Sequence, residues 1–251
     1  MDPQKLKFIL WLPTILGFSL VLGLWLHGMQ IASTRATNII TVTGSAKKIV
    51  MADLAKWSSS FQREANLANL PAAIQAIKTD SENIKRFLIS FGLQERSITF
   101  LPIQTEPFYQ SLEEFGAKFG YSQPRIAGYF VTRGLRVESE DIEKIEQLSQ
   151  NVNALAKDGI LFQYNSSEYH YTKLNELRPE LYAEATKDAL IRAQAIARGT
   201  GVKIGKLHSA RTGVIQILSP HSTNIEDYGA YDLSTKEKEI TATTHVSFVL
   251  H

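Results

Sequence analysis

The residues from Phe8 to Met29 form a run of 22 amino acids without Asp, Glu, Lys or Arg. As a helix rising 1.5 Å per residue, this run is about 33 Å long, which is enough to cross a hydrocarbon core of about 30 Å. Trp11 and Trp25 lie near its two ends, where indole side chains favour the lipid headgroups. A water-exposed helix would need a polar face, which this run lacks. The sequence therefore predicts one membrane-spanning helix at about residues 8–29.

A cleaved signal peptide is the alternative interpretation of this run. Signal peptides have an apolar region of about 7–15 residues, followed by a small-x-small cleavage site. The run is longer than that, and the residues between Ala32 and Ala36 match a cleavage site poorly. We therefore expect residues 1–36 to hold a short N-terminal stub, a retained anchor and a linker.

Charged residues beside the run predict its orientation. Lys5 and Lys7 flank its N-terminal side closely, whereas Arg35 stands alone on the other side. Positive charge favours the cytoplasmic side of a membrane, so we expect the N-terminus inside. Lys47 and Lys48, further along the chain, reduce this asymmetry.

Ser19, Gly23 and His27 follow one another at four-residue intervals, on one stripe of the predicted helix. Small residues at this spacing let two membrane helices approach closely. Ser19 and Gly23 are therefore candidate helix-packing residues, although Gly and Ser are also simply common in membrane helices. We expect His27 to reach the membrane interface.

The composition of the chain predicts that residues 37–251 form a globular domain. The chain is 44% hydrophobic and 21% charged, and about 70% of the surface of an unfolded domain of this length is buried on folding. The net charge of +2 comes from basic residues scattered among acidic ones, so we expect no nucleic-acid partner. The chain has no cysteine, which excludes disulfides, thiolate metal sites and thiol catalysis.

Apolar periodicity predicts two strand–helix–strand patterns, because apolar residues alternate in strands and recur every three to four residues in helices. Strands are predicted at 39–45, 55–62, 97–105, 126–138, 160–171, 206–218 and 240–250, and helices at 69–91, 139–157 and 175–198. We therefore expect an α+β fold with helices packed on one face of a mainly antiparallel sheet. Its pseudo-repeat halves are predicted at about 39–124 and 125–251.

Two predicted loops, 107–124 and 219–238, are longer than ordinary connections. The second is the more polar one. The first carries five aromatic residues, and so many aromatic side chains either fold back onto their own core or contact another chain. With intramolecular packing as the alternative, the candidate oligomer contacts are Phe108, Tyr109, Phe115, Phe119 and Tyr121.

Catalytic motifs are missing from the sequence. It contains neither G-x-S-x-G nor H-E-x-x-H, and its six histidines are dispersed. The glycine-rich stretch 199–205 follows a predicted helix, so we interpret it as a helix end and not as a phosphate loop. His170, in a predicted strand, is more simply a half-exposed strand residue than a catalytic one. We predict no catalytic residue, no cofactor and no metal site.

Five short stretches, in collinear order, resemble the SIMPL-domain family of bacterial envelope proteins. They are TVTGSA (Thr41–Ala46), FGLQERSITF (Phe91–Phe100), IAGYFV (Ile126–Val131), DALIRAQAIARGTGVKIGKL (Asp188–Leu207) and ITATTHVSFVL (Ile240–Leu250). The resemblance covers about residues 39–251. Family members usually have Pro-Asp before the second strand, where this chain has Ala52-Asp53, and the aromatic loop is longer than is typical of them.

The resemblance implies a two-part α+β fold, a periplasmic or surface location, self-association into ring-like or channel-like homo-oligomers, and a loose link to oxidative-stress tolerance. No enzymatic activity or cofactor is established for the family, so no functional residue carries over. With the predicted anchor, this indicates a single-pass protein of the bacterial inner membrane, with a cytoplasmic N-terminus and a periplasmic domain.

We therefore expect a non-enzymatic envelope scaffold whose partners are copies of itself and the lipid bilayer. One alternative is a periplasmic binding or accessory subunit that docks on another membrane complex. The other is a hydrolase whose site is assembled only in the folded chain.

Overall fold

The computed structural model describes residues 17–27, 38–109, 125–222 and 229–251 of the chain. After a helix at residues 17–27, the elements are β1 (Ile39–Met51), β2 (Leu54–Ala65), α2 (Leu70–Ser90), η1 (Glu95–Ser97), β3 (Ile98–Tyr109), β4 (Ile126–Ser139), α3 (Ile142–Asn151), η3 (Val152–Asp158), β5 (Phe162–His170), α4 (Leu174–Thr200), β6 (Ile204–Thr212), β7 (Gln216–Leu218) and β8 (Glu237–Leu250).

The chain divides into two compact units. Unit 1 consists of the described residues within Met1–Ala46, together with Tyr182–Gly213 and Thr243–His251. Unit 2 consists of the described residues within Lys47–Leu181 and Val214–Ala242.

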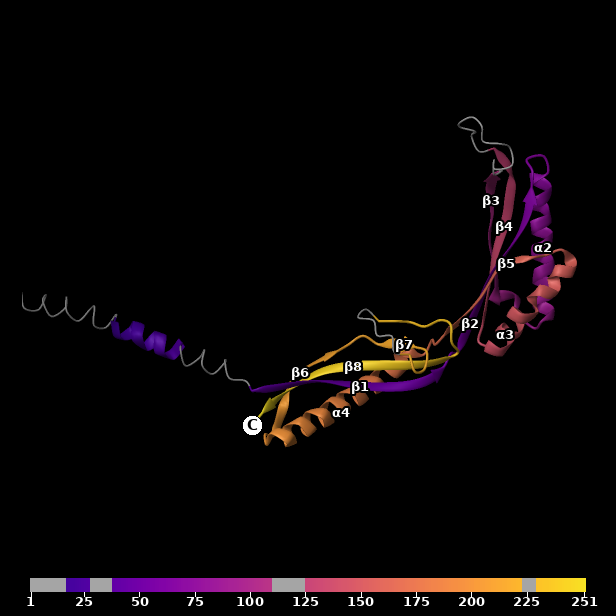
Figure 1. The fold of residues 1–251 in the computed structure, drawn as a ribbon. Coiled ribbons are helices and arrows are strands. Elements are labelled where there is room, and N and C mark those ends of the chain that lie inside the picture. The colour runs from indigo at the N-terminus through magenta and orange to yellow at the C-terminus, as the bar shows by residue number, and fades with distance from the viewer. Residues whose placement is uncertain (1–16, 28–37, 110–124, 223–228) are drawn as a thin grey trace, which may run out of the picture. The chain divides into compact units, whose positions relative to one another are not determined.

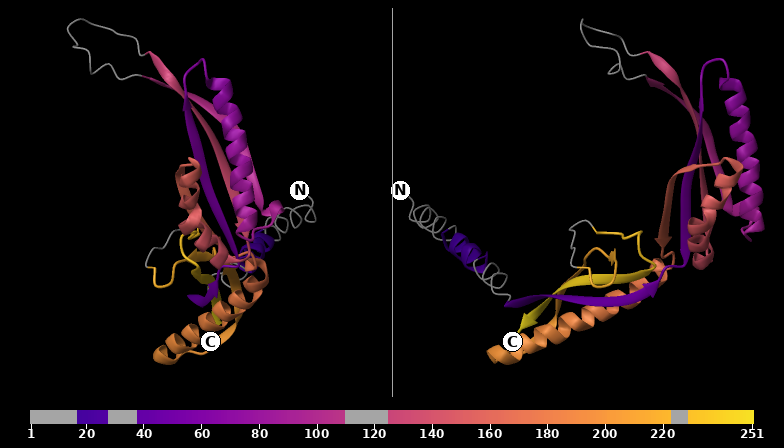
Figure 2. Two further views of the ribbon diagram at one scale, coloured as in Figure 1. Left: turned by 90° about the vertical axis from the view of Figure 1, so that its right-hand side faces the viewer. Right: turned by 45° about the vertical axis from the view of Figure 1, so that its right-hand side comes forward.

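Unit 2 is built on a four-stranded antiparallel sheet in the order β3-β4-β2-β5. Its central strand β2 alternates as the sequence predicts: Ala55, Trp57, Ser59 and Phe61 are buried, and the residues that alternate with them are partly exposed. The helices α2 and α3 both contact β2 and β4, so they cover the same face of the sheet (Figures 1 and 2).

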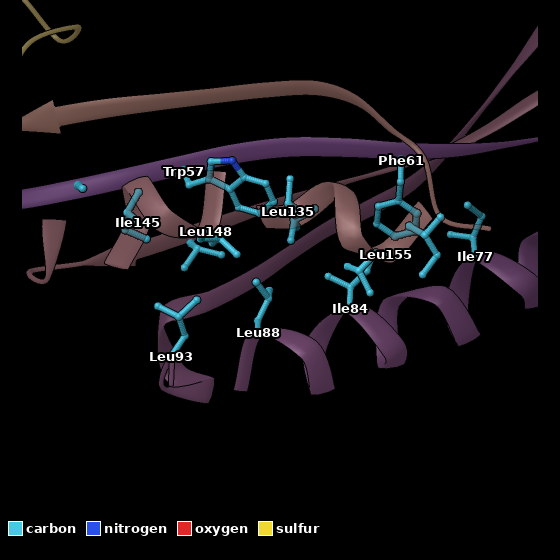
Figure 3. Close-up of a cluster of buried hydrophobic side chains, with 14 of the residues drawn as sticks. Trp57, Phe61, Ile77, Ile84, Leu88, Leu93, Leu135, Ile145, Leu148 and Leu155 are labelled. Atoms are coloured by element: carbon cyan, nitrogen blue, oxygen red, sulfur yellow. The ribbon is translucent and has the colours of Figure 1, made fainter. Parts of the chain in front are cut away.

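The core of unit 2 lies between this face and the two helices. Trp57 and Phe61 point from β2 toward α2, which supplies Ile84 and Leu88, and Leu148 comes from α3 (Figure 3). All five side chains are almost completely buried. Each contributes about 1.5–3 kcal/mol to folding through the transfer of apolar surface out of water.

The boundaries of α2 follow from its end residues. Pro71 occupies its first turn, where a missing N–H costs nothing, and Gly92 has a φ of +91° just beyond its C-terminus. The buried residues Ile77, Ile84 and Leu88 recur on one stripe of the helix. The helix predicted at 69–91 is confirmed.

Unit 1 contains most of α4, which packs on strands of the second sheet. The order of that sheet is β1-β8-β6, and β7, which belongs to unit 2, also pairs with β8. Four alanines at four-residue intervals, Ala185, Ala189, Ala193 and Ala197, form the buried stripe of α4. Ala189 and Ala193 join Val42, Val246 and Phe248 in a small apolar cluster. Small side chains on the helix let it lie close to the strands.

Several predicted boundaries were wrong. The helix predicted at 139–157 is α3 followed by the 3₁₀ helix η3. It begins later than predicted because Asp141 caps α3 by accepting a 3.0 Å hydrogen bond from the Lys144 amide. The strand predicted at 206–218 is two strands, β6 and β7. The first long loop begins later than predicted, since β3 continues to Tyr109 by pairing with β4.

The mixed α+β class with mainly antiparallel pairing is confirmed. The pseudo-repeat halves at 39–124 and 125–251 stay a prediction, and the two compact units divide the chain differently. β4, from the second half, pairs with β2 and β3 from the first, and β1 and β8 belong to one sheet. Apolar periodicity carries no information on which strands pair, so it favoured a division along the chain.

Candidate functional site

The candidate oligomer contact lies at the far end of the β3–β4 hairpin in unit 2. Phe108 pairs in register with Gly128, and its ring stacks on that of Phe130 with a centroid separation of 4.5 Å. A Cβ on Gly128 would lie 2.7 Å from the Phe108 ring and 2.8 Å from the Ala65 carbonyl oxygen. The glycine therefore makes room for the ring to lie across β4, and Phe108 packs within its own subunit.

Tyr109 and Ile126 form the outermost described pair of the hairpin. The Tyr109 side chain is 54% exposed and that of Ile126 is 51% exposed. Exposed apolar side chains at adjacent positions, beside a stacked aromatic pair, form a surface that another protein can cover. The remaining predicted contact residues, Phe115, Phe119 and Tyr121, lie outside the described residues.

The candidate helix-packing residues Ser19 and Gly23 lie in the helix at 17–27 and are exposed. A Cβ on Gly23 would meet no atom within 4 Å. Of the predicted span at 8–29, the structure describes only this part. Among the helices that it describes, none is both long enough and apolar enough to cross a membrane.

His170 lies at the end of β5, where its Nε2 atom is 3.3 Å from a carboxylate oxygen of Glu168. Its ring centroid is 6.2 Å from that of Tyr231. Tyr231 is bound in turn to the backbone of Tyr171, whose amide donates a 3.1 Å hydrogen bond to the tyrosine oxygen. The described residues contain no group of three His, Cys, Asp or Glu side chains arranged to hold a metal ion.

Asp232 and Lys238 form a buried ion pair that the periodicity of the sequence did not reveal. The Lys238 side chain is fully buried, and its ammonium lies 3.2 Å from an Asp232 carboxylate oxygen and 2.5 Å from the Asp232 carbonyl oxygen. Burial alone raises the pKa of Asp232, but hydrogen bonds from Ser234, Thr235 and Lys238 outweigh it and hold the pKa well below its usual value. The pair ties the turn at Asp232 to the first residues of β8.

A second unpredicted ion pair joins α2 to the sheet of unit 2. Asp80 is 5% exposed and accepts two hydrogen bonds from Arg63, of 2.6 Å and 2.9 Å. These hydrogen bonds raise the pKa of the Arg63 guanidinium. The next helix residue, Ser81, accepts a 2.8 Å hydrogen bond from Arg133 of β4. Polar contacts therefore fix the rotation of α2 over the sheet.

The stretch TVTGSA has a structural role in unit 1. A Cβ on Gly44 would lie 2.8 Å from the Ala189 Cβ, and closer still to the Ala185 carbonyl oxygen and the Ala189 nitrogen. The next residue, Ser45, donates its amide to Asp188 of α4 at 2.8 Å. Gly44 and the alanine stripe are thus the two sides of one close helix–strand contact.

Comparison with known proteins agrees with these features. The family model of SIMPL, described as a protein of unknown function (DUF541), matches residues 40–248. The chain is also similar to the uncharacterized protein YggE of Edwardsiella ictaluri, with 24% identity over 208 residues, covering 79% of this chain and 78% of the relative. The matched range includes Gly44, the alanine stripe of α4 and both sheets, and the chain belongs to the SIMPL family.

Proposed function

We propose that the protein is a non-enzymatic, membrane-anchored scaffold of the bacterial envelope, which assembles from identical copies into a ring or channel. The observation that carries the proposal is the exposed pair Tyr109 and Ile126 at the end of the hairpin. In a ring, every copy has a neighbour, so one such surface on each subunit finds a partner without leaving an unpaired edge.

The anchor supports assembly by confining the subunits to a plane. Confinement raises the effective concentration of one subunit near another, so a modest contact suffices. In this proposal the helix at about 8–29 spans the inner membrane, the N-terminus is cytoplasmic, and both units are periplasmic. Ser19 and Gly23 pack against the anchor of a neighbouring subunit.

The mass of the purified full-length protein in mild detergent tests the assembly. A ring has a mass several times the 28.1 kDa of one chain, whereas an accessory subunit that docks on another complex is a monomer or dimer. The double variant Tyr109→Ser, Ile126→Ser should remain folded by circular dichroism and elute as smaller species. Tyr164→Ser is the matched control, because Tyr164 is also 54% exposed and lies in the same sheet.

If the double variant has the same mass as the wild type, the hairpin end is not part of the contact between subunits. A monomeric wild-type protein would refute the scaffold itself and favour the accessory subunit. Intact-mass analysis of membrane-extracted material tests the anchor separately, since a chain that begins near residues 33–37 would identify a cleaved signal peptide.

A further inference from the structure

One stretch of unit 1 is basic without any acidic residue. Residues 189–213 contain five Lys and Arg residues and no Asp or Glu. Three of these cations lie where α4 ends and β6 begins, in residues 196–207, which we term the α4–β6 corner. Arg198, Lys203 and Lys206 are exposed there, and none of them makes an ion pair with a described residue.

The α4–β6 corner also exposes apolar side chains. Leu207 is 57% exposed, Ile196 is 49% exposed and Val202 is 36% exposed. Leu207 pairs with the buried Phe248 but remains exposed, because β6 is an edge strand. Seven of the nine residues of β6 are exposed, on both faces of the strand. An edge strand with so many exposed residues is a surface that another molecule can cover.

Helix stability accounts for only part of this arrangement. Arg198 lies in the last turn of α4, where a cation favours the negative end of the helix dipole. Lys206 and Leu207 lie beyond the helix, and the dipole gives no reason for either. Cations interleaved with apolar side chains are instead the composition that binds anionic lipid, through headgroup charge and shallow insertion together.

The corner lies at the end of unit 1 from which the chain leads to the predicted anchor. Lys203 and His251 exchange two backbone hydrogen bonds of 2.9 Å, and the Leu250 amide donates to the Asn38 carbonyl oxygen at 2.7 Å. Figure 1 shows the start of β1, the start of β6 and the C-terminus together within this unit. Residues 30–37 span at most about 30 Å, so an anchor ending at Met29 keeps this end near the membrane.

We propose that the α4–β6 corner is a lipid-binding surface that docks unit 1 on anionic phospholipid headgroups. This proposal rests on the membrane anchor of the proposed function, and it does not depend on the assembly into a ring. Docking would give the tethered domain a fixed orientation on the membrane.

The chain has no cysteine, so one introduced cysteine gives a unique labelling site. The full-length Leu207→Cys variant is labelled at the new cysteine with an environment-sensitive fluorophore. The labelled protein is then reconstituted into lipid nanodiscs that contain a spin-labelled quencher lipid. Leu161→Cys is the matched control, because Leu161 is 60% exposed but lies in unit 2. Circular dichroism checks that both variants remain folded.

We expect quenching at position 207 to be several-fold stronger than at 161 in discs containing phosphatidylglycerol. It should weaken in pure phosphatidylcholine and at high salt, which screens charge. The triple variant Arg198→Gln, Lys203→Gln, Lys206→Gln should lose most of the difference. Equal quenching at 207 and 161, or quenching indifferent to phosphatidylglycerol, would overturn the proposal.

A chain that does not insert into the discs would refute the anchor and not the surface. The same chain is then added to phosphatidylglycerol vesicles from solution. If the wild-type chain sediments with the vesicles and the triple variant does not, the result supports the lipid surface. If the wild-type chain does not sediment with them, the lipid surface is refuted.

Discussion

Replacing Gly44 by alanine should destabilise unit 1 through one added methyl group. The new Cβ would lie within 3 Å of three atoms of α4, and two of them, the Ala185 carbonyl oxygen and the Ala189 nitrogen, belong to the helix backbone. A flexible side chain would move aside at little cost, but here the whole helix must shift away from β1. That shift also stretches the 2.8 Å hydrogen bond from the Ser45 amide to Asp188.

The expected cost is at the upper end of what overpacking produces. Extra methyl groups in a packed core cost about 1–3 kcal/mol where neighbouring side chains rearrange, and more where they do not. We therefore expect Gly44→Ala to lower the free energy of unfolding by about 3 kcal/mol. For a chain of this size, this corresponds to a fall in melting temperature of roughly 10 °C.

Gly199→Ala is the matched control for this substitution. Gly199 lies in α4, where an added Cβ would meet no atom within 4 Å, and alanine is favoured over glycine in a helix by about 1 kcal/mol. Thermal melting by circular dichroism should show a fall for Gly44→Ala and no fall for Gly199→Ala. Hydrogen exchange should locate the loss of protection in β1 and α4. A Gly44→Ala protein that melts with the wild type would refute the close packing of α4 on β1.

Three further predictions concern polar groups. Asp80→Ala should lower the free energy of unfolding by about 2 kcal/mol in denaturant titrations, because it leaves the half-buried Arg63 without its acceptor. An unchanged denaturation midpoint would show that water replaces the carboxylate as the partner of Arg63. Asp232→Asn should cost about 3 kcal/mol at neutral pH by leaving the buried Lys238 without a counterion. The pKa of Asp232 is lower in the folded protein than its ordinary value of 3.8, so its contribution to stability is present above about pH 4 and is lost as the pH falls further. The Asp232→Asn variant should therefore lose less stability on acidification than the wild type. Parallel curves of stability against pH for the two proteins would contradict this assignment. Thr244→Val should raise the melting temperature, with a gain of about 1 kcal/mol, since the buried Thr244 hydroxyl has no hydrogen-bond partner among the described residues; a lower melting temperature would indicate that the hydroxyl is bonded after all.

Much of the local structure could be predicted from the sequence, because local structure depends on local periodicity. The alternation from Ala55 to Gln62 identified the central strand β2, and the apolar stripe with Pro71 and Gly92 located α2 to within about two residues. The contact role of the aromatic residues stays a prediction: Tyr109 is exposed, and Phe108 stacks on Phe130 of its own subunit.

The order of the strands in the sheets could not be predicted from the periodicity of the sequence. The sequence shows β4 as a strand, but only the sheet register shows that it lies between β3 and β2, so that strands from both predicted halves share one sheet. Apolar patterns describe one element at a time, whereas strand order depends on contacts between residues far apart in the chain.

The sequence alone was enough to predict the α+β class, most strands of both sheets and the absence of cysteine chemistry, and it contains the apolar run at Phe8–Met29. Only the tertiary structure showed why Gly44 is a glycine, that Lys238 is buried beside Asp232, and that the apolar side chains of the α4–β6 corner are exposed. Periodicity reports which face of an element is apolar. The exposure of a side chain and the room around it depend on which elements the fold brings together, and these can be distant in sequence, as Gly44 and Ala189 are.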